Sequence, residues 1–235
     1  MHAKALGATM DSSAIPDRVG RPLYSYADAD RLAGVSRGTS KRWISGYRSN
    51  NALGERVEYP PITPDNDALG AVSFVELIEI VAIGRLKESR FSIKRIRQIV
   101  EQCQSLLKVP RPLAMLSFKF DGRDIFVNKG ETLLGLGKNK GQQAWNDLLS
   151  PFLEELDYTG SYASRWWPLG RDKPIIIDPD YGYGLPVIEN SGIRTETILE
   201  RFNAGELAHQ IAEDFNLNTM QVERALLFES NHRVA

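Results

Sequence analysis

The sequence predicts an α+β fold that is mainly α-helical, and three observations lead to this prediction. Apolar residues recur at helical spacing in residues 24–47 and 73–107, short β-type runs follow Pro112, and helical spacing returns after residue 190. The chain has 235 residues, of which 42% are hydrophobic and 25% charged. These values are typical of a globular protein with one large domain or two modest ones.

Residues 24–47 have the pattern of a helix–turn–helix. Ser25 can cap the first helix, and Asp28 stands three residues later, at the position that completes a capping box. Gly34 suits the turn, and Ser36 is expected to cap the second helix. The two helices would pack as a unit through small apolar faces.

The second helix of this pair is short, basic and rich in hydroxyl groups, while Trp43 and Ile44 are expected to face the core. Cationic side chains can neutralise phosphates, and hydroxyl or guanidinium groups can reach base edges in a DNA major groove. The alternative without a function is an αα-hairpin whose polar face is only exposed to solvent. DNA binding is favoured because the basic residues are concentrated on the helix that would enter the groove. The expected DNA contacts are Arg37, Thr39, Ser40, Lys41 and Arg42, with Tyr47, Arg48 and Arg56 as flanking phosphate contacts.

Proline and glycine separate this pair from two longer helices. Residues 48–70 hold three prolines and include a short strand at 56–59, which suits a wing-like loop beside the helix–turn–helix. A capping box at Ser73 predicts the start of the first long helix. Ser92 begins a second one with a continuous apolar stripe, and Pro110 ends it.

A small antiparallel β meander is expected after these helices. Its three strands are predicted at 116–120, 125–127 and 132–136, with Asp-Gly and Lys-Gly turns between them. Helical pieces are expected at 142–149 and after Ser150. Residues 158–190 are expected to be irregular and are rich in aromatic residues, with one strand expected at 175–177.

The C-terminal residues predict a second helix–turn–helix, with its turn at 216–218. Its helices are expected to bury three apolar faces, which are Ile198, Leu199 and Phe202, then Leu207, Ile211 and Phe215, and last Val222, Ala225 and Leu226. Its charge differs from that of the first. Residues 1–115 hold 17 Lys and Arg against 12 Asp and Glu, whereas residues 116–235 hold 12 against 18. An acidic surface is repelled by phosphates. We therefore expect protein contacts, not DNA contacts, from the C-terminal helices.

Other functional classes find little support. No stretch resembles a secretory signal or reaches the ~20 apolar residues of a membrane span, and the single cysteine, Cys103, suits a reducing compartment. A cytoplasmic protein without membrane contact is expected.

The glycines at 135–138 lack the spacing of a phosphate-binding loop, and the histidines are scattered without the spacing of metal ligands. Asp178 and Asp180 flank a proline and suit a turn. No enzymatic site, metal or cofactor is predicted.

Two segments resemble known families. The first is YSYADADRLAGVSRGTSKRWI followed by VSFVELIEIVAIGRLKESRFSIKRIRQIV, which looks like the DNA-binding domain of MerR-type regulators. The second is GLPVIENSGIRTETILERFNAGELAHQIAEDFNLNTMQVERALLFE, which resembles a small bacterial helical domain common in antitoxins. The combination is similar to larger VapB-type antitoxins, which are paired with PIN-domain ribonuclease toxins.

The resemblance implies a homodimer that binds and silences a PIN-domain ribonuclease toxin and represses its own operon by binding operator DNA. An inserted arginine could neutralise the acidic active site of such a toxin. The candidates for toxin contact are Arg194, Arg224 and Arg233, together with Trp166 and Trp167, although both tryptophans also suit a core. The alternative function is a free-standing MerR-like transcription regulator with a ligand- or partner-binding C-terminal half.

The chain departs from the MerR pattern in one respect. MerR proteins usually dimerise through a long helix, whereas here the helix ends at Pro110 and no sensor cysteine cluster follows, so metal sensing is not expected. The predicted organisation is a flexible tail at 1–20, a MerR-like DNA-binding domain at 21–112, a β meander and helical connector at 113–180, and a C-terminal helical antitoxin-type domain at 181–235.

Overall fold

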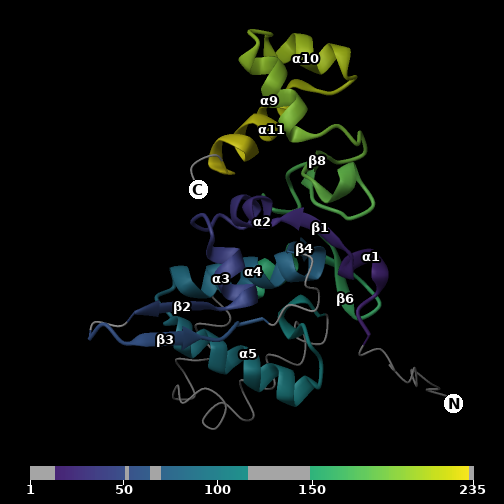
Figure 1. Cartoon of the computed structure of the whole chain (residues 1–235). Coiled ribbons are helices and arrows are strands. Elements are labelled where there is room, and N and C mark those ends of the chain that lie inside the picture. Colours follow the sequence, from purple (N-terminus) through teal and green to yellow (C-terminus); the bar gives the residue numbers. More distant parts are fainter. Residues whose placement is uncertain (1–13, 51–52, 64–69, 116–148, 233–235) are drawn as a thin grey trace, which may run out of the picture.

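The computed structural model describes residues 14–50, 53–63, 70–115 and 149–232 (Figure 1). Within them, helices combine with four two-stranded antiparallel sheets. The expected meander at 116–136, the glycines at 135–138, the helix at 142–148, Arg233 and nearly all of the expected tail lie outside the described residues. None of the described helices has the length and apolar character needed to cross a membrane.

The N-terminal part begins with α1 (Asp17–Gly20) and β1 (Pro22–Ser25), followed by α2 (Tyr26–Leu32) and α3 (Thr39–Ser45). The predicted capping box of α2 is confirmed, because the Ser25 side chain accepts a hydrogen bond from the backbone N–H of Asp28 and the Asp28 carboxylate accepts one in return. The predicted pair of helices is therefore confirmed, as α2 and α3.

A hairpin of β2 (Tyr47–Asn50) and β3 (Arg56–Tyr59) follows α3, which confirms the strand expected at 56–59. The rings of Tyr47 and Tyr59 stack across its base with centroids 4.6 Å apart. Gly46 joins α3 to the hairpin with φ +71°, and a Cβ there would lie 2.6 Å from the carbonyl oxygen of Tyr59. Only glycine fits this close approach, so the hairpin is held beside α3.

The longest buried element is α4 (Phe74–Glu88), which follows β4 (Ala71–Ser73), the strand that pairs with β1. Its predicted capping box at Ser73 is confirmed. The sequence pattern predicted one apolar face, but almost every side of α4 is buried. The reason is that α1, α2, α5 and the later strand β6 all pack around it.

Helix α5 (Ile93–Leu107) follows α4 and is amphipathic, as predicted. The Ser92 hydroxyl caps it by accepting a hydrogen bond from the backbone N–H of Arg95. Its core face includes Ile96, Val100 and Cys103. The helix ends at a left-handed Lys108 (φ +54°), and the 3-10 turn η1 (Pro112–Ala114) then packs against α4. This turn brings a buried arginine to α4.

Arg111 is 1% exposed and forms ion pairs with two buried carboxylates of α4. Its guanidinium lies 2.5 Å from Glu76 Oε1 and 3.3 Å from Glu79 Oε2. The other oxygen of Glu79 accepts a hydrogen bond from the backbone N–H of Leu113 at 3.3 Å. One cation thus faces two carboxylates, and burial, against the opposing effect of Arg111, raises the pKa of Glu79 from 4.5 to about 7.

Replacing Glu79 by Gln is expected to flatten the dependence of stability on pH. The folded state holds the Glu79 proton between pH 4.5 and about 7, where the unfolded state has lost it. The free energy of unfolding of the wild type should therefore fall as pH rises through this interval. Urea unfolding at several pH values between 4.5 and 8 measures the slope, and equal slopes in Glu79→Gln and wild type would contradict the assignment.

The second half of the described chain begins with a short helix at 149–154 and continues into a hairpin of β5 (Leu156–Thr159) and β6 (Tyr162–Trp166). The prediction of an irregular segment from residue 158 was wrong for this part, because β6 pairs along its length with β5. A strand is confirmed at β7 (Ile175–Ile176), which pairs with β8 (Val187–Ile188). The 3-10 turn η2 (Gly182–Gly184) lies between them.

Three helices complete the described chain: α9 (Thr195–Asn203), α10 (Ala208–Asp214) and α11 (Thr219–His232). They bury Ile198, Ile211 and Val222, as the predicted helical faces required. Phe202 and Leu207 were expected in the same faces, but they are 45% and 55% exposed. Figure 1 shows these helices at one end of the molecule, next to α2, and the β2–β3 hairpin extending away from the body.

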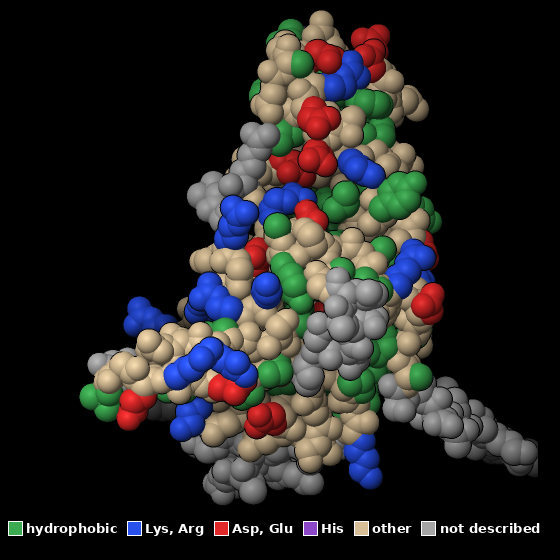
Figure 2. Space-filling model, viewed as in Figure 1, with side chains coloured by type: hydrophobic (Ala, Val, Ile, Leu, Met, Phe, Trp, Pro, Cys, Tyr) green, Lys and Arg blue, Asp and Glu red, His purple; other side chains and the backbone are tan. Residues whose placement is uncertain are grey.

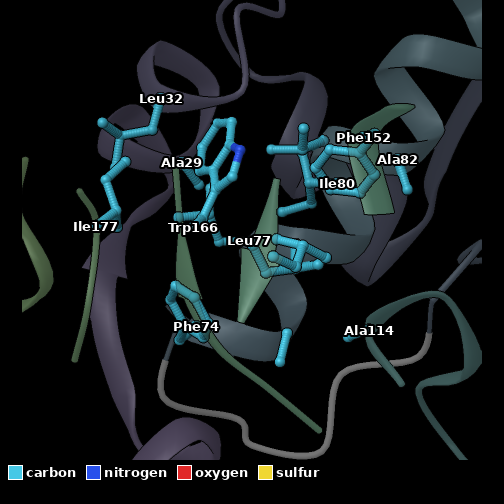
Figure 3. Packing of buried hydrophobic residues seen from close by; sticks show 14 of the residues in the cluster. Ala29, Leu32, Phe74, Leu77, Ile80, Ala82, Ala114, Phe152, Trp166 and Ile177 are labelled. Atoms are coloured by element: carbon cyan, nitrogen blue, oxygen red, sulfur yellow. The ribbon is translucent and has the colours of Figure 1, made fainter. Parts of the chain in front are cut away.

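A continuous hydrophobic core connects the two halves (Figure 3). It joins Ala29 and Leu32 of α2 to Leu77 of α4, Phe152, and Trp166 of β6. Both expected core tryptophans are buried, at 3% exposure for Trp166 and 7% for Trp167. Their indole N–H groups donate to carboxylates of the same half, Glu155 and Asp157 respectively. Because both tryptophans are buried, neither side chain is available on the surface to contact a toxin, as had been considered from the sequence.

Candidate nucleic-acid interface

The start of α3 is held by a carboxylate from the preceding helix. The N-terminal cap residue is Gly38, with φ +80°, and no side chain of its own turn caps the helix, so the prediction that Ser36 caps it was wrong. Instead, the buried Asp30 of α2 accepts hydrogen bonds from the backbone N–H groups of Gly38 at 2.5 Å and Ser40 at 2.7 Å. A carboxylate at a helix N-terminus is also favoured by the helix dipole.

Two of the residues expected to contact DNA are buried in this arrangement. Thr39 is 6% exposed and Ser40 is fully buried, because the first turn of α3 packs against α2. Neither side chain is presented on the surface, so their expected role as contacts to base edges does not fit the structure. Their hydroxyl groups belong to the packing of the helix pair.

The basic residues of the same segment are exposed. Arg37 lies in the turn before α3, and Lys41 and Arg42 lie on its outer side. The Nε of Arg42 donates to the carbonyl oxygen of Gly38 at 3.1 Å, which holds its guanidinium near the N-terminal end of α3. Within the described residues none of these three cations forms an ion pair with a carboxylate. They are therefore available for phosphates.

The hairpin extends this basic surface (Figure 2). Arg56 is exposed, and Arg48 pairs with Glu58 at 3.3 Å with both side chains well exposed. An exposed pair of this kind is worth less than about 1 kcal/mol, so a phosphate can compete for Arg48. Tyr47 is 37% exposed at the base of the hairpin. Figure 2 shows Lys and Arg side chains over α3 and the hairpin, and Asp and Glu side chains over α9–α11.

A further cation beside α3 was not predicted from any sequence pattern. Lys87 lies near the end of α4, and its ammonium group is 5.9 Å from the centre of the Trp43 ring of α3. It is exposed and lies beside α3, the helix that carries Lys41 and Arg42. Only the packing of α4 against the helix pair places it there.

Helix α2 also contacts the C-terminal helices. Arg31, the neighbour of Asp30, lies 3.4 Å from the buried Glu229 of α11. Glu229 also accepts a hydrogen bond from the hydroxyl of Thr195 at the start of α9. Consecutive residues of α2 thus fix α3 on one side and contact α11 on the other.

A second connection runs through Asp178. This residue forms the predicted turn by accepting the backbone N–H of Asp180 at 2.9 Å. It is 1% exposed and also forms ion pairs with Arg18 of α1 at 2.8 Å and Arg165 of β6 at 2.9 Å. The turn therefore anchors the β7–β8 region to the N-terminal part of the chain.

Two of the three arginines predicted to contact a toxin, Arg194 and Arg224, lie in or next to the C-terminal helices. Arg194 precedes α9, and its guanidinium lies 5.6 Å from the centre of the Tyr183 ring. Arg224 is half-buried in α11, and Arg233 lies outside the described residues. Across the part of the chain that the structure describes, no three His, Cys, Asp or Glu side chains are grouped so that they could hold a metal ion.

Comparisons with known proteins agree with this arrangement. Residues 22–100 match the family described as "Putative DNA-binding HTH domain", and residues 175–228 match "Protein of unknown function (DUF433)". The first match begins at β1 and ends within α5, so it includes α3 and the hairpin. The chain therefore contains a helix–turn–helix module similar to DNA-binding domains. The match does not distinguish a MerR type, which stays a prediction.

Full-length relatives come from Mycobacterium tuberculosis. The chain is 26% identical to "Uncharacterized protein Rv2308", over 92% of this chain and 93% of that protein. It is 25% identical to "Putative antitoxin VapB45", over 87% and 92% of the two chains. The crystal structure of Rv2018 shares the fold, with a TM-score of 0.64 at 22% identity over 87% of this chain and 97% of that one. The match to a DNA-binding helix–turn–helix family and the similarity to a protein named as a putative antitoxin favour a regulator over an enzyme.

Proposed function

We propose that the chain is the antitoxin of a toxin–antitoxin pair, which binds operator DNA through α3 and the β2–β3 hairpin and neutralises a PIN-domain ribonuclease through its C-terminal half. The observation that carries the DNA part is the set of three exposed cations, Arg37, Lys41 and Arg42, on a helix–turn–helix. Similarity to a protein named as an antitoxin supports the second part.

In the proposed complex, α3 enters the major groove with its N-terminal end toward the bases. This is the usual orientation of a recognition helix. Arg42 would contact a base edge, while Arg37, Lys41, Arg48, Arg56 and Lys87 would contact phosphates, with Tyr47 at the base of the hairpin. Two copies in a homodimer would occupy half-sites about one helical turn apart. Autorepression would follow if the operator overlaps the promoter of the chain's own operon.

Replacing Arg42 by Ala should weaken operator binding by about 1–3 kcal/mol and relax base preference at one position of each half-site. Fluorescence anisotropy on operator and scrambled duplexes measures both effects. Arg95→Ala is the matched control, because Arg95 lies on α5 and, among the described residues, its side chain donates only to Gln98 of its own helix. Equal operator affinity for Arg42→Ala and wild type would remove Arg42 from the interface.

Co-expression with the adjacently encoded protein tests the toxin partner. The expected result is a stable complex in which the ribonuclease no longer cleaves RNA. Arg194→Ala and Arg224→Ala test whether an arginine is inserted into the nuclease active site, since loss of inhibition with either variant would identify the inserted group. A lone dimer, with no nuclease encoded nearby, would contradict the antitoxin proposal.

One observation favours a second candidate, a free-standing regulator that binds a ligand. A cavity of about 420 Å³ lies beside the β7–β8 hairpin, in the size range of small-molecule sites. It is lined by apolar Ile176, Val187 and Ile188 and by polar Arg165, Tyr181, Glu189, Asn190 and Ser191. A regulator of this kind would bind its operator fully without a nuclease, which the co-expression experiment distinguishes.

A further inference from the structure

The cavity beside the β7–β8 hairpin holds two opposite charges that do not pair with each other. Arg165 reaches its wall from β6, and Glu189 reaches it from the turn that follows β8. Among the described residues, no ion pair joins these two side chains although both line the same cavity. A gap between the guanidinium and the carboxylate is therefore left for a ligand.

Arg165 is fixed in place, yet part of its guanidinium is unused. Its Nε donates to Oδ2 of the buried Asp178 at 2.9 Å, and its guanidinium lies 5.7 Å from the centre of the Tyr181 ring. In the part of the chain that the structure describes, its two terminal nitrogens donate to no other group. Such nitrogens bind a carboxylate in a two-point contact. Arg201, which pairs with two carboxylates, shows that one guanidinium of this chain can hold a second anion.

Glu189 supplies the negative charge of the cavity. The residue is half-buried, and its backbone N–H donates to the carbonyl oxygen of Pro174 at 2.8 Å, which fixes it at the end of β8. Its carboxylate has no hydrogen bond or ion pair within the described residues. An unpaired carboxylate attracts an ammonium group and repels a ligand that carries only negative charge.

The remaining wall offers apolar surface. Ile176 and Val187 lie in the cavity and form a small buried cluster with Trp167. Tyr181, which is 50% exposed, adds an aromatic ring. The volume of about 420 Å³ falls in the size range of small-molecule sites. A ligand that fits all parts of this wall carries a positive group, a negative group and an apolar group.

We propose that this cavity binds a free α-amino acid with an apolar side chain. The ligand's carboxylate accepts hydrogen bonds from the terminal nitrogens of Arg165, its ammonium group donates to Glu189, and its side chain covers Ile176 and Val187. A simple carboxylic acid leaves Glu189 unpaired, and a simple amine leaves Arg165 unpaired. No residue of α3 or of the C-terminal helices lines the cavity. The inference therefore goes beyond the antitoxin proposal and does not depend on it, while it supplies the ligand class for the second candidate function.

Isothermal titration calorimetry of the full chain with leucine, methionine and phenylalanine tests the site. At least one of them should bind with a Kd below about 1 mM. The N-acetyl derivative of that amino acid lacks the ammonium charge, and its amide lacks the carboxylate. Each should bind about tenfold more weakly or worse, because a polar group of the site is then left without its partner.

Two variants assign the charges of the site. Glu189→Gln should weaken binding of the amino acid about tenfold and should not weaken binding of its N-acetyl derivative, which has no group for Glu189 to hold. Arg165→Lys keeps a cation beside Asp178 but loses the two-point contact, so it should weaken binding of both. Glu196→Gln is the matched control, because Glu196 is an exposed glutamate of α9 that does not line the cavity. Circular dichroism melts identical to that of the wild type show that the variants are folded.

Three results would overturn the inference. The first is that none of the three amino acids binds at concentrations up to about 10 mM. The second is equal affinity for the amino acid and its N-acetyl derivative, since the site would then take a simple anion. The third is an unchanged affinity for the amino acid in Glu189→Gln. None of these measurements involves a nuclease or DNA, so the antitoxin proposal stands or fails separately.

Discussion

Replacing Arg111 by Ala is expected to lower the free energy of unfolding by about 3–5 kcal/mol. At pH 8, above the pKa of about 7 of Glu79, the change would leave the carboxylates of Glu76 and Glu79 buried without their cation, and neither can reach water, since they are 6% and 0% exposed. It would also release η1, whose backbone N–H at Leu113 donates to Glu79. The large effect thus comes from uncompensated buried charge and not from the strength of the ion pairs themselves.

Urea unfolding of Arg111→Ala measures this loss, and a compensated variant tests its cause. Arg111→Met combined with Glu76→Gln and Glu79→Gln removes all three charges while keeping similar volumes. It should recover most of the lost stability, because replacing a buried ion cluster by neutral groups is often close to neutral. If the triple variant is as unstable as Arg111→Ala, packing and not charge is responsible. A loss below about 1 kcal/mol in Arg111→Ala would contradict the burial argument.

The features that the sequence predicted well are those decided by neighbouring residues. The capping boxes at Ser25 and Ser73 depend on side chains three positions apart, and both are present. The cap of α5 by Ser92 and the strand at 56–59 are equally local. Such patterns can be recognised in the sequence, because a capping side chain forms hydrogen bonds with backbone groups of the same helical turn.

Features that depend on distant parts of the chain could not be predicted. The burial of α4 on nearly all sides needs β6, which follows it by more than seventy residues. The β5–β6 hairpin was hidden because β6 shows no regular alternation of apolar and polar residues, and β5, which does alternate, is only four residues long. Both Thr39 and Ser40 were expected on the surface because hydroxyl groups suit DNA contacts, yet α2 covers them. Lys87 reaches the candidate interface only through tertiary packing.

Replacing Asp30 by Ala is expected to disable the candidate recognition helix. The backbone N–H groups of Gly38 and Ser40 would lose their acceptor in a buried position. Each unsatisfied donor costs about 1–3 kcal/mol, so the loss in unfolding free energy for the two donors should be about 2–6 kcal/mol. Operator affinity should fall about tenfold or more even where the variant is fully folded, because Lys41 and Arg42 lose the fixed start of α3 from which they project.

Two companion variants separate positioning from general destabilisation. Asp30→Asn keeps one carbonyl oxygen as acceptor and should retain part of both stability and operator affinity. Asp28→Ala breaks the capping box of α2 and should cost about 1 kcal/mol of stability, yet it leaves the α3 cap intact and should bind operator as the wild type does. If Asp30→Ala bound operator with wild-type affinity at a temperature well below its melting point, the carboxylate would serve stability alone. Loss of affinity in Asp30→Ala but not in Asp28→Ala would identify Asp30 as the residue that positions α3 for DNA.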